Sequence, residues 1–431
     1  MNFIFISPGF PYNYYRFCQA LKKDGVNVLG IGDMPYDQLN PELIKCLTEY
    51  YRVDNLADYE EMRKAVAFFI FKYGKIDWLE SNNEYWLEQD ARLRTDFNIT
   101  TGWKSDDIMK VRCKSKMKKY YEMAGVKTAR WHLVDDKEDC LDFIKEVSYP
   151  VIVKPDSGVG ASHTYRLKND ADLDEFFKTK EKKVPYIMEE YVDGTITTFD
   201  GVTDNLCEPL YYASYSETDS LMDVVNENKD TWYYVKKEIE PELMEAGKRT
   251  LLAFGCYNRY FHLEFFKANS DKPGRWKKGE IIALEVNMRP AGGYTPDMES
   301  YSGDVDLYQI YADMITKKLT HAFLPKERKF CVYAANRAEY SYLHTDSDIK
   351  NKYASALKMT GEIPPVLQDD LGKDFYMAVF DTFDQVKDFE SYVLEKKGEK
   401  PAVPEAEEKK EKGFPQPQDK KDESKETEDK K

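Results

Sequence analysis

Short apolar runs alternate with longer stretches of helical spacing through roughly the first 100 residues. The apolar runs have the composition of buried strands and lie at Asn2–Ile6, Val26–Ile31, Tyr50–Val53 and Ile76–Glu80. The helical stretches lie at Tyr12–Lys23, Asp58–Tyr73 and Glu84–Asp96. This alternation predicts a parallel, doubly wound sheet, in which ligands bind beyond the carboxyl ends of the strands.

Two polar loops follow strands of this predicted sheet. Ser7-Pro8-Gly9 follows the first strand, and Ser81-Asn82-Asn83-Glu84 follows the fourth. Asn83 is therefore a candidate to touch a substrate. Each loop is also an ordinary strand-to-helix turn with a side chain that caps the helix, so both interpretations stay open.

The pattern changes near Trp103. A basic helix is predicted over Met109–Met123, ending at Gly125. Few helices separate the later strand patterns, which lie at Arg130–Val134, Val151–Lys154, Tyr186–Glu190, Thr197–Thr203, Leu210–Ser216, Tyr260–Phe266 and Ile281–Val286. This order indicates an α+β region with antiparallel sheets. Two more strand patterns, Phe330–Ala335 and Phe375–Phe380, indicate a small closing subdomain.

These patterns divide the chain into four parts. Residues 1–104 form a Rossmann-like domain, and residues 105–325 form a domain of two α+β subdomains. Residues 326–395 form a small α/β subdomain, and residues 396–431 form a disordered charged tail. The stretch from Glu399 to Lys431 holds nine Lys against eleven Asp or Glu, with Phe414 as its single aromatic residue. Such a segment cannot bury enough apolar surface to order itself.

Composition narrows the class of protein. The net charge of -15 argues against a nucleic-acid backbone as the main partner. The seven Cys are scattered singly, which favours free thiols in a reducing compartment over a zinc site or a disulfide framework. The longest apolar run, Ala65–Phe71, is far too short to span a membrane, and the N-terminus lacks the features of a signal peptide. We therefore expect a cytoplasmic protein without membrane contact.

The segment Leu284–Gly293 carries the most informative polar pattern. Glu285, Asn287 and Arg289 are spaced two apart, so they share one face of an extended strand, and the other face carries Leu284, Val286 and Met288. Carboxylate and amide oxygens suit Mg²⁺, and an adjacent Arg suits a phosphate. The segment indicates a Mg-nucleotide site on one strand, with an exposed polar strand face as the alternative.

A strand lysine followed by a glycine-rich loop is the second signal. Val151–Lys154 leads into Pro155–Ser162, in which Gly158 and Gly160 let the backbone approach phosphate oxygens closely. Lys154 precedes the glycines, so the loop is not a Walker A P-loop. A Gly-rich hairpin turn is the alternative.

Two further strands carry acids. Tyr186–Gly194 runs into a turn with Glu189, Glu190 and Tyr191, whose backbone and carboxylates could meet an adenine or its ribose, with solvated acids as the alternative. Within Tyr260–Phe266, His262 and Glu264 share one face. A lone Glu among aromatic residues is costly to bury unpaired. A metal ion beside Glu285 or a salt bridge would offset the cost of burying Glu264. His262 is interpreted as a structural hydrogen-bonding residue.

In order along the chain, these signals are a basic helix, a strand lysine with a Gly loop, an acidic hinge, an isolated strand Glu and Glu-x-Asn-x-Arg. This order resembles the ATP-grasp superfamily, specifically its carboxylate–amine ligase branch related to carbamoyl-phosphate synthase. The resemblance covers roughly residues 1 to 319. It implies that the first sheet is a pre-ATP-grasp domain and that residues 105–325 are the ATP-grasp domain.

The resemblance also implies roles for individual positions. Lys114 and Lys154 would contact nucleotide phosphates, with Lys110 and Lys116 competing for the role of Lys114. The loop over the phosphates would include Ser157, Gly158, Gly160 and Ala161. The residues that hold adenine would be Glu189, Glu190, Tyr191 and Val192. The Mg²⁺ ligands would be Glu264, Glu285 and Asn287.

Arg289, assisted by Lys154, would stabilise the transferring phosphoryl group. Arg259 and Tyr294 flank the metal strands and are candidates for gripping the acid, with a structural salt bridge as the alternative for Arg259. One departure is that Gly194–Thr197 lacks the acid that meets the ribose in many members of the family.

The implied activity is an ATP-dependent ligase that joins a carboxylate to an amine through an acyl phosphate and releases ADP and phosphate. Its cofactors would be ATP and two Mg²⁺ ions, with Mn²⁺ as an alternative, and its partners would be small molecules and a second copy in a homodimer. An ATP-grasp kinase and a non-catalytic nucleotide-binding module stay open. The complete metal set argues against the module, and the lack of a biotin-attachment segment argues against a biotin carboxylase.

Overall fold

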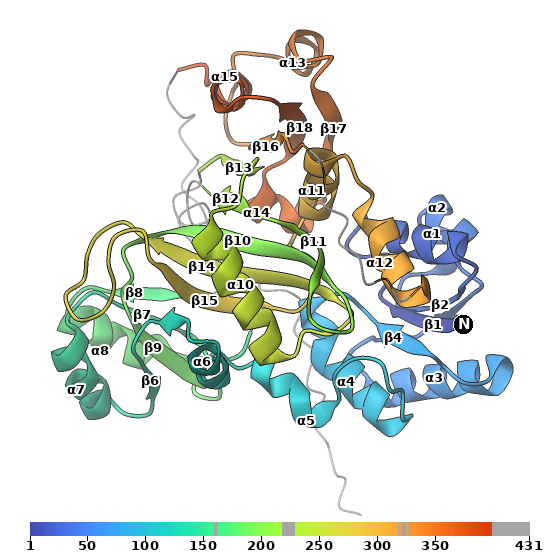
Figure 1. Ribbon diagram of the computed structural model, residues 1–431, viewed down its shortest axis with the longest axis horizontal. Helices are drawn as coiled ribbons and strands as arrows, with labels where there is room; N and C mark the ends of the chain where they lie inside the picture. Colours follow the sequence, from blue (N-terminus) through green and yellow to red (C-terminus); the bar gives the residue numbers. More distant parts are fainter. Residues whose placement is uncertain (159–162, 218–228, 318, 320–324, 326, 399–431) are drawn as a thin grey trace, which may run out of the picture.

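The computed structural model of the chain describes residues 1–431 except 159–162, 218–228, 318, 320–324, 326 and 399–431 (Figure 1). Its strands are β1 Asn2–Ile6, β2 Asn27–Gly32, β3 Glu49–Arg52, β4 Trp78–Glu80, β5 Lys127–Thr128, β6 Trp131–Val134, β7 Val151–Pro155, β8 Tyr165–Leu167, β9 Tyr186–Glu190, β10 Gly194–Thr203, β11 Pro209–Ala213, β12 Tyr215–Glu217, β13 Thr231–Val235, β14 Tyr260–Ala268, β15 Ile281–Asn287, β16 Phe330–Asn336, β17 Leu357–Glu362 and β18 Asp374–Phe380.

Its α-helices are α1 Tyr15–Lys23, α2 Pro41–Cys46, α3 Tyr59–Tyr73, α4 Leu87–Asp96, α5 Ser105–Ile108, α6 Lys114–Met123, α7 Lys137–Val147, α8 Asp170–Thr179, α10 Pro241–Phe254, α11 Thr295–Gly303, α12 Leu307–Lys317, α13 Asp346–Lys352, α14 Gln368–Leu371 and α15 Phe383–Val393. The 3₁₀ turns are η1 Tyr36–Gln38, η2 Glu84–Trp86, η3 Met109–Val111 and η4 Pro365–Leu367.

The N-terminal sheet is parallel, with the strand order β3-β2-β1-β4. Its core follows from the alternation of side chains along β1. Phe3 and Phe5 belong to the apolar cluster of α1, whereas Ile4 and Ile6 belong to the cluster of α3. Helices therefore cover both faces, and the predicted doubly wound sheet is confirmed.

A small antiparallel sheet has the strand order β6-β9-β7-β8. One face packs on α7 and α8 through a cluster that includes Val151, Val153 and Met188. The residues in between, such as Ile152, Lys154 and Glu189, point to the other face. That face looks towards the large sheet and α6.

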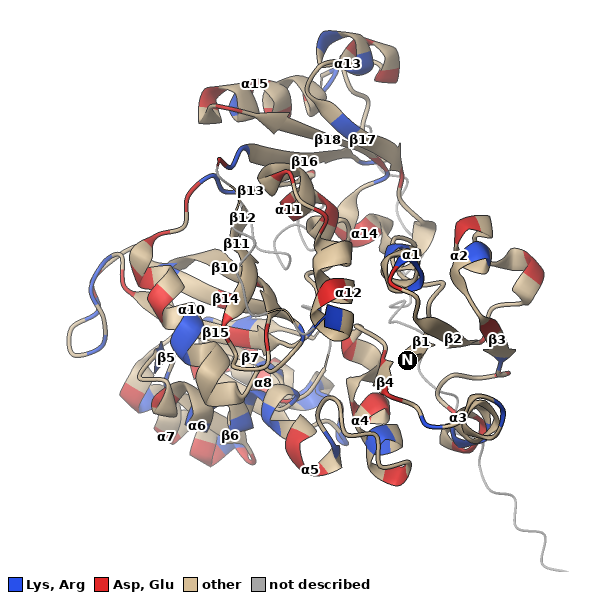
Figure 2. Cartoon of the chain, turned by 45° about the vertical axis from the view of Figure 1, so that its right-hand side comes forward, with Lys and Arg blue, Asp and Glu red and all other residues tan. Residues whose placement is uncertain are grey.

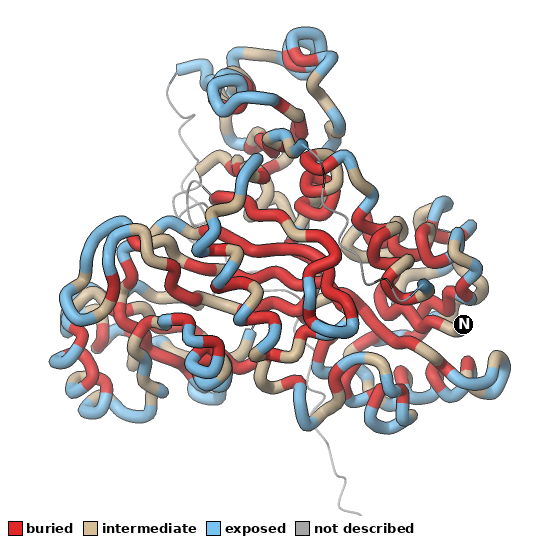
Figure 3. Tube along the Cα trace, viewed as in Figure 1, coloured by how far each residue is buried: buried red, intermediate tan, exposed pale blue. Residues whose placement is uncertain are grey.

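The large sheet has the strand order β17-β18-β16-β13-β12-β10-β14-β15-β5, with β11 added beside β10. Its central strands are buried along most of their length (Figure 3). Phe199, Phe261, Leu263 and Val286 pack with α6 and α10 on one face. Strands β16 and β18 continue this sheet through the pairing of β16 with β13. The mixed α/β and α+β fold class predicted from the sequence is confirmed.

Local details differ from the predicted elements. The basic helix is interrupted, because η3 ends at Val111 and α6 begins at Lys114. The strand predicted over Leu210–Ser216 divides into β11 and β12. Glu264 pairs with Glu285, but Phe265 pairs with Ala283, so Leu284 is an extra, bulged residue. Strict alternation predicted that Leu284 shares an apolar face with Val286 and Met288. In the structure Leu284 is not part of the apolar cluster that contains these two residues.

Surface and thiol features are simple. Acidic and basic residues are interspersed on outer helices such as α3 and α4 (Figure 2). All seven Cys are buried free thiols. Among the described helices, none has the length and apolar character needed to cross a membrane. Most of the predicted charged tail, residues 399–431, lies outside the described residues.

Candidate nucleotide site

Six polar side chains form a grid on one face of β10, β14 and β15. Strand register places Asp200, His262 and Asn287 in one row and Thr198, Glu264 and Glu285 in the next. Residues opposite each other on paired strands, and residues two apart on one strand, share a face. The grid therefore lies opposite the apolar face that packs on α6 and α10. Sequence alternation predicted this face for Glu264, Glu285 and Asn287.

Hydrogen bonds connect most of the grid. The Glu264 Oε1 atom accepts from His262 Nε2 at 3.0 Å and from Asn287 Nδ2 at 3.2 Å. His262 Nδ1 lies 2.6 Å from Asp200 Oδ1, and the hydroxyl of Thr198 also donates to Asp200. Burial lowers the pKa of His262, but the two carboxylates outweigh burial and raise its pKa to about 10. Each ring nitrogen of His262 thus lies within hydrogen-bond distance of a carboxylate oxygen.

Helix α6 packs on the apolar face through Met117 and Tyr121, but it also supplies lysines whose ammonium groups reach the polar residues. Lys114 Nζ lies 3.0 Å from Glu285 Oε1, and both side chains are largely buried. Lys118, one turn later, pairs with Glu189 of the small sheet. Lys116 is exposed, and Lys110 pairs with Asp107 at 3.7 Å. The geometry therefore supports Lys114 among the three lysines that competed in the sequence.

Glu189 joins Lys154 of the small sheet to Lys118 of α6. Lys154 Nζ lies 2.8 Å from Glu189 Oε2, and Lys118 contacts Glu189 Oε1. Burial raises the pKa of Glu189, but the two ammonium groups outweigh burial and lower its pKa to about 2. Burial likewise lowers the pKa of Lys154, but Glu189 and Glu285 raise it further than burial lowers it. Glu189 is therefore a carboxylate at neutral pH, whereas burial lowers the pKa of Lys118 by more than its carboxylate partners raise it.

The loop after β7 is tied to the start of α6. The Lys114 amide donates to the Asp156 carbonyl at 2.8 Å, and Ser115 donates to the Asp156 carboxylate from its amide and its hydroxyl. Ser157 lies beside Cys113, with 3.1 Å between Oγ and Sγ. Gly158 has φ +155° and is exposed. The other predicted loop residues, Gly160 and Ala161, lie outside the described residues.

The hinge residues after Glu189 point in different directions. The Glu190 carboxylate is fully buried among Arg130, Lys272 and Arg275, at 2.7 to 3.1 Å, on the face opposite Glu189. The ring of Tyr191 lies under the Arg166 guanidinium at 4.4 Å. Val192 packs in an apolar cluster with Ala129, Trp276 and Ile282. The side chain of Glu190 is therefore engaged in a structural ion cluster, away from Lys118 and Lys154.

Arg289 faces the N-terminal sheet. Its Nε atom lies 3.6 Å from Glu84 Oε2, and Arg112 also pairs with Glu84. Glu84 follows β4, so the carboxyl edge of the parallel sheet reaches the end of β15. Asn83 caps the η2 turn by accepting from the Tyr85 amide at 3.0 Å.

The two remaining substrate candidates are engaged elsewhere. Arg259 is buried, pairs with Glu80 at 3.0 Å and stacks over Trp103 at 4.2 Å, as the salt-bridge alternative predicted. Tyr294 stacks on Phe375 with ring centroids 4.8 Å apart. Within the part of the chain that the structure describes, neither side chain forms a hydrogen bond or ion pair with the polar grid.

Sequence reasoning did not select Lys118, Asp200, Thr198 or Glu84 for this site. Lys118 could have been found, because it lies four residues after Lys114 and so shares its helix face. Thr198 and Asp200 repeat the two-residue spacing of His262 and Glu264, but only the register shows that they lie beside them. Glu84 is placed by tertiary packing, which leaves no local signal.

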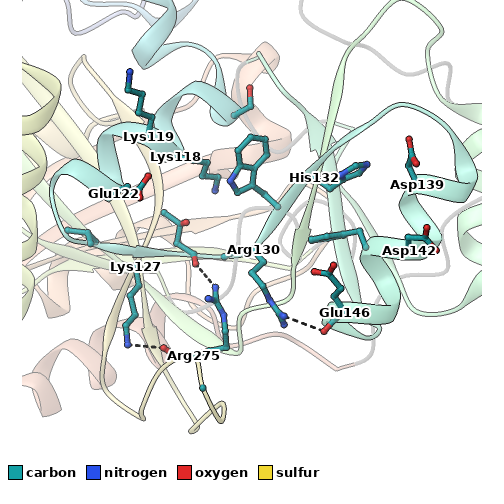
Figure 4. A pocket seen from close by; sticks show the side chains of 17 residues that line it. Lys118, Lys119, Glu122, Lys127, Arg130, His132, Asp139, Asp142, Glu146 and Arg275 are labelled. Carbon is teal, nitrogen blue, oxygen red and sulfur yellow. Dashed lines mark hydrogen bonds between the residues drawn. The ribbon is translucent and has the colours of Figure 1, made fainter.

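An open cavity of about 1150 Å³ adjoins this region between α6, β6, α7 and the turn at Gly274 (Figure 4). Lys118 is one of its lining residues. Two of its other basic side chains bond to backbone carbonyls: Lys127 donates to the Arg275 carbonyl, and Arg130 donates to the Glu146 carbonyl. The cavity therefore adjoins the lysines of the site but has its own mixed-charge lining.

The chain is similar in sequence to several known proteins. Residues 110–195 match the family described as "Carbamoyl-phosphate synthase L chain, ATP binding domain". The L-arginine-specific L-amino acid ligase of Bacillus subtilis is 24% identical over 274 residues, covering 60% of this chain and 62% of the relative. The chain thus spans less than two thirds of the length of that curated relative.

Solved structures extend the likeness to nearly the whole fold. An L-amino acid ligase from Bacillus licheniformis has a TM-score of 0.68 at 15% identity, covering 90% of this chain and 95% of that one. The biotin carboxylase domain dimer of Hydrogenobacter thermophilus 2-oxoglutarate carboxylase, described in complex with MgADP, ADP and bicarbonate, has a TM-score of 0.61 at 15% identity, with 90% and 88% coverage.

The fold is that of ATP-grasp ligases. The resemblance predicted from the sequence is confirmed: the chain has the ATP-grasp ligase fold and is related to the ATP-binding domain of carbamoyl-phosphate synthase.

Proposed function

We propose that the protein is an ATP-dependent carboxylate–amine ligase that forms an acyl phosphate and releases ADP and phosphate. One observation carries the proposal. Lys114, Lys118 and Lys154 face Glu189 and Glu285 between the small sheet and the large sheet, beside Glu264 and Asn287. This arrangement joins phosphate-binding cations to oxygen ligands for a divalent ion.

The buried ion pairs support a ligand-binding role for this cluster. Lys154, Lys118 and Glu189 are all buried, and burying charges is costly unless they are well paired. A nucleotide phosphate could replace Glu189 as the anionic partner of Lys118 or Lys154. A divalent ion could replace Lys114 as the cationic partner of Glu285. The site is thus built from charges that can exchange protein partners for ligand partners.

The residues present fit Mg²⁺. Glu264 and Glu285 are directly opposite on paired strands, with Asn287 two residues further, and these are oxygen donors of the kind that Mg²⁺ prefers. Among the described residues, no cluster of three or more His, Cys, Asp or Glu side chains is arranged as a metal site by itself. This suits an ion whose remaining ligands come from nucleotide phosphates and water. Two Mg²⁺ ions, or Mn²⁺ instead, are part of the proposal.

The reaction uses the chain mainly for positioning and charge stabilisation. Lys114 and Lys154 hold the phosphates, and Arg289 stabilises charge on the γ-phosphoryl group. Mg²⁺ held by Glu264, Glu285 and Asn287 would neutralise negative charge on the nucleotide phosphates. A substrate carboxylate oxygen bonds to the γ-phosphorus as the bond to ADP breaks. The amine nitrogen then bonds to the acyl carbon, the carbon–oxygen bond to phosphate breaks, and the nitrogen loses a proton.

The substrate class is proposed from the relatives. Two similar proteins are named L-amino acid ligases, so amino acids are the first carboxylates and amines to test.

We also propose the division of the chain at residues 104, 325 and 395, a homodimer and a cytoplasmic location. A dimer occurs in one structural relative.

The test is an ADP and phosphate assay with pairs of amino acids and small acids, with mass detection of the product. We expect ADP release that requires both partners, and acyl hydroxamate when hydroxylamine replaces the amine. AMP and pyrophosphate as products would contradict the ligase. Turnover on a hydroxyl substrate without an amine would identify a kinase instead.

A further inference from the structure

Half of the polar grid has no role in the proposed nucleotide chemistry. Thr198, Asp200 and His262 occupy the three positions next to the proposed metal ligands on the same face. All three are buried. Buried polar groups cost free energy unless their hydrogen bonds are satisfied, so this set of residues needs a reason.

A chain of hydrogen bonds connects Thr198 to Glu264 through Asp200 and His262. Thr198 accepts from the Tyr215 amide at 3.0 Å and donates to Asp200. Asp200 accepts from His262 Nδ1, and His262 Nε2 donates to Glu264 Oε1. The Tyr215 ring stacks on the imidazole with centroids 5.8 Å apart and an interplanar angle of 15°. The imidazole is thus fixed at its edge by Asp200 and at its face by Tyr215.

The two oxygens of Glu264 are used differently. Oε1 accepts from both His262 and Asn287, whereas no described residue donates a hydrogen bond to Oε2. The side chain is 25% exposed, while that of His262 is 4% exposed. The Oε1 atom is therefore fixed by His262 and Asn287, and the Oε2 atom is left for a ligand.

We propose that Asp200 and His262 are positioning residues that hold the Glu264 carboxylate with Oε2 directed at the divalent ion of the nucleotide complex. The inference rests on the proposed Mg-nucleotide site. Carboxylate ligands that are held by hydrogen bonds keep their orientation when the ion binds, and loss of such support costs about 10- to 100-fold in metal affinity or activity. Asp200 and His262 act through Glu264 and need not touch the ion.

The test compares ADP binding with Mg²⁺ and with EDTA by titration calorimetry. The wild-type protein should bind ADP more tightly with Mg²⁺, and the ratio of the two affinities measures the contribution of the ion. His262→Phe keeps a flat ring against Tyr215 but donates no hydrogen bond. We expect it to reduce this ratio by about 10- to 100-fold and to leave the affinity in EDTA unchanged.

His262→Gln retains a donor that can reach Glu264, so it should preserve most of the ratio. Asp200→Asn is the second variant, because it keeps the size of the side chain and so retains the fold if His262→Phe unfolds. Asp204→Asn is the matched control. Asp204 is also a buried aspartate, but it accepts from the Leu206 and Glu208 amides in the turn after β10. The ratio of ADP affinities with Mg²⁺ and with EDTA should be the same for Asp204→Asn as for the wild type.

Three results would overturn the proposal. The first is a folded His262→Phe or Asp200→Asn protein with the wild-type ratio. The second is an equal loss of affinity with Mg²⁺ and with EDTA, which indicates general damage to the site. The third is a wild-type protein whose ADP affinity does not depend on Mg²⁺. The ligase proposal can fail independently, through a lack of acyl hydroxamate, while the predicted ratios still hold.

Discussion

Two adjacent glutamates on β9 belong to two different charge clusters. Glu189 lies between Lys118 and Lys154, which are almost fully buried, whereas Glu190 lies among Arg130, Lys272 and Arg275, whose side chains are 29 to 34% exposed. Alternation along the strand sends the first carboxylate towards α6 and the large sheet and the second to the outer side. The first group of charges, termed the cleft cluster, consists of Lys114, Lys118, Lys154, Glu189 and Glu285. The second, termed the outer cluster, consists of Glu190, Arg130, Lys272 and Arg275. We therefore propose that similar residue types serve ligand binding in one cluster and structure in the other.

The clusters also differ in what they connect. The cleft cluster joins α6, the small sheet and the edge of the large sheet, where a nucleotide would separate the charges. The outer cluster, in contrast, ties β9 to the segment before β6 and to the turn between β14 and β15, with backbone contacts such as Arg275 to the Thr128 carbonyl at 3.0 Å. We infer that charge changes in the cleft alter activity first and that changes in the outer cluster alter stability first.

The largest effect is expected for Glu285→Ala in the cleft. This variant loses a proposed metal ligand and leaves Lys114 without its carboxylate, so kcat should fall by about 10²- to 10³-fold, the size typical for removal of a transition-state electrostatic group. Steady-state ADP release measures the loss, and circular dichroism should show an unchanged fold. Full activity would remove Glu285 from the metal site.

Lys114 and Lys116 form a matched pair on α6. Lys114→Met should raise the KM for ATP by about 10-fold or more, equivalent to about 1.4 kcal/mol of lost binding, because the phosphates lose a buried cation. Lys116→Met should leave KM unchanged, since Lys116 is exposed. Equal effects of the two substitutions would contradict the assignment of Lys114.

Arg275→Met tests the outer cluster. The variant removes two hydrogen bonds to the buried Glu190 carboxylate but leaves Arg130 and Lys272 in place. We expect a loss of about 1–3 kcal/mol in the free energy of unfolding, measured with urea, and an unchanged kcat. A loss of activity without a loss of stability would break the distinction between the clusters.

The smallest effect is a pH dependence. Lys118 and Lys154 hold the pKa of Glu189 near 2, below its value of about 4.3 in an unfolded chain. The folded state therefore binds fewer protons, and this stabilisation is present above about pH 4 and is lost as the pH falls towards about 2. The stability advantage of the wild type over Glu189→Gln should narrow across that window. An advantage that does not change with pH would contradict the ion pairs.

Much of the fold could be predicted because its signals are local. The strand and helix periods of the first sheet, and the two-residue spacing of Glu285 and Asn287, are properties of short segments. The bulge at Leu284, the break before Lys114 and the opposite roles of Glu189 and Glu190 depend on pairing partners far along the chain. Asp200 and Glu84 join the site only through register and packing, so their types and spacing could not identify them.

The most direct test of the central claim follows the carboxylate oxygen. Once a substrate pair is known, the carboxylate is labelled with ¹⁸O, and the phosphate released with ADP is analysed by mass spectrometry. An acyl phosphate transfers one carboxylate oxygen to phosphate in each turnover, so labelled phosphate is expected in proportion to product. Unlabelled phosphate, or label in AMP, would contradict the proposed reaction at this site.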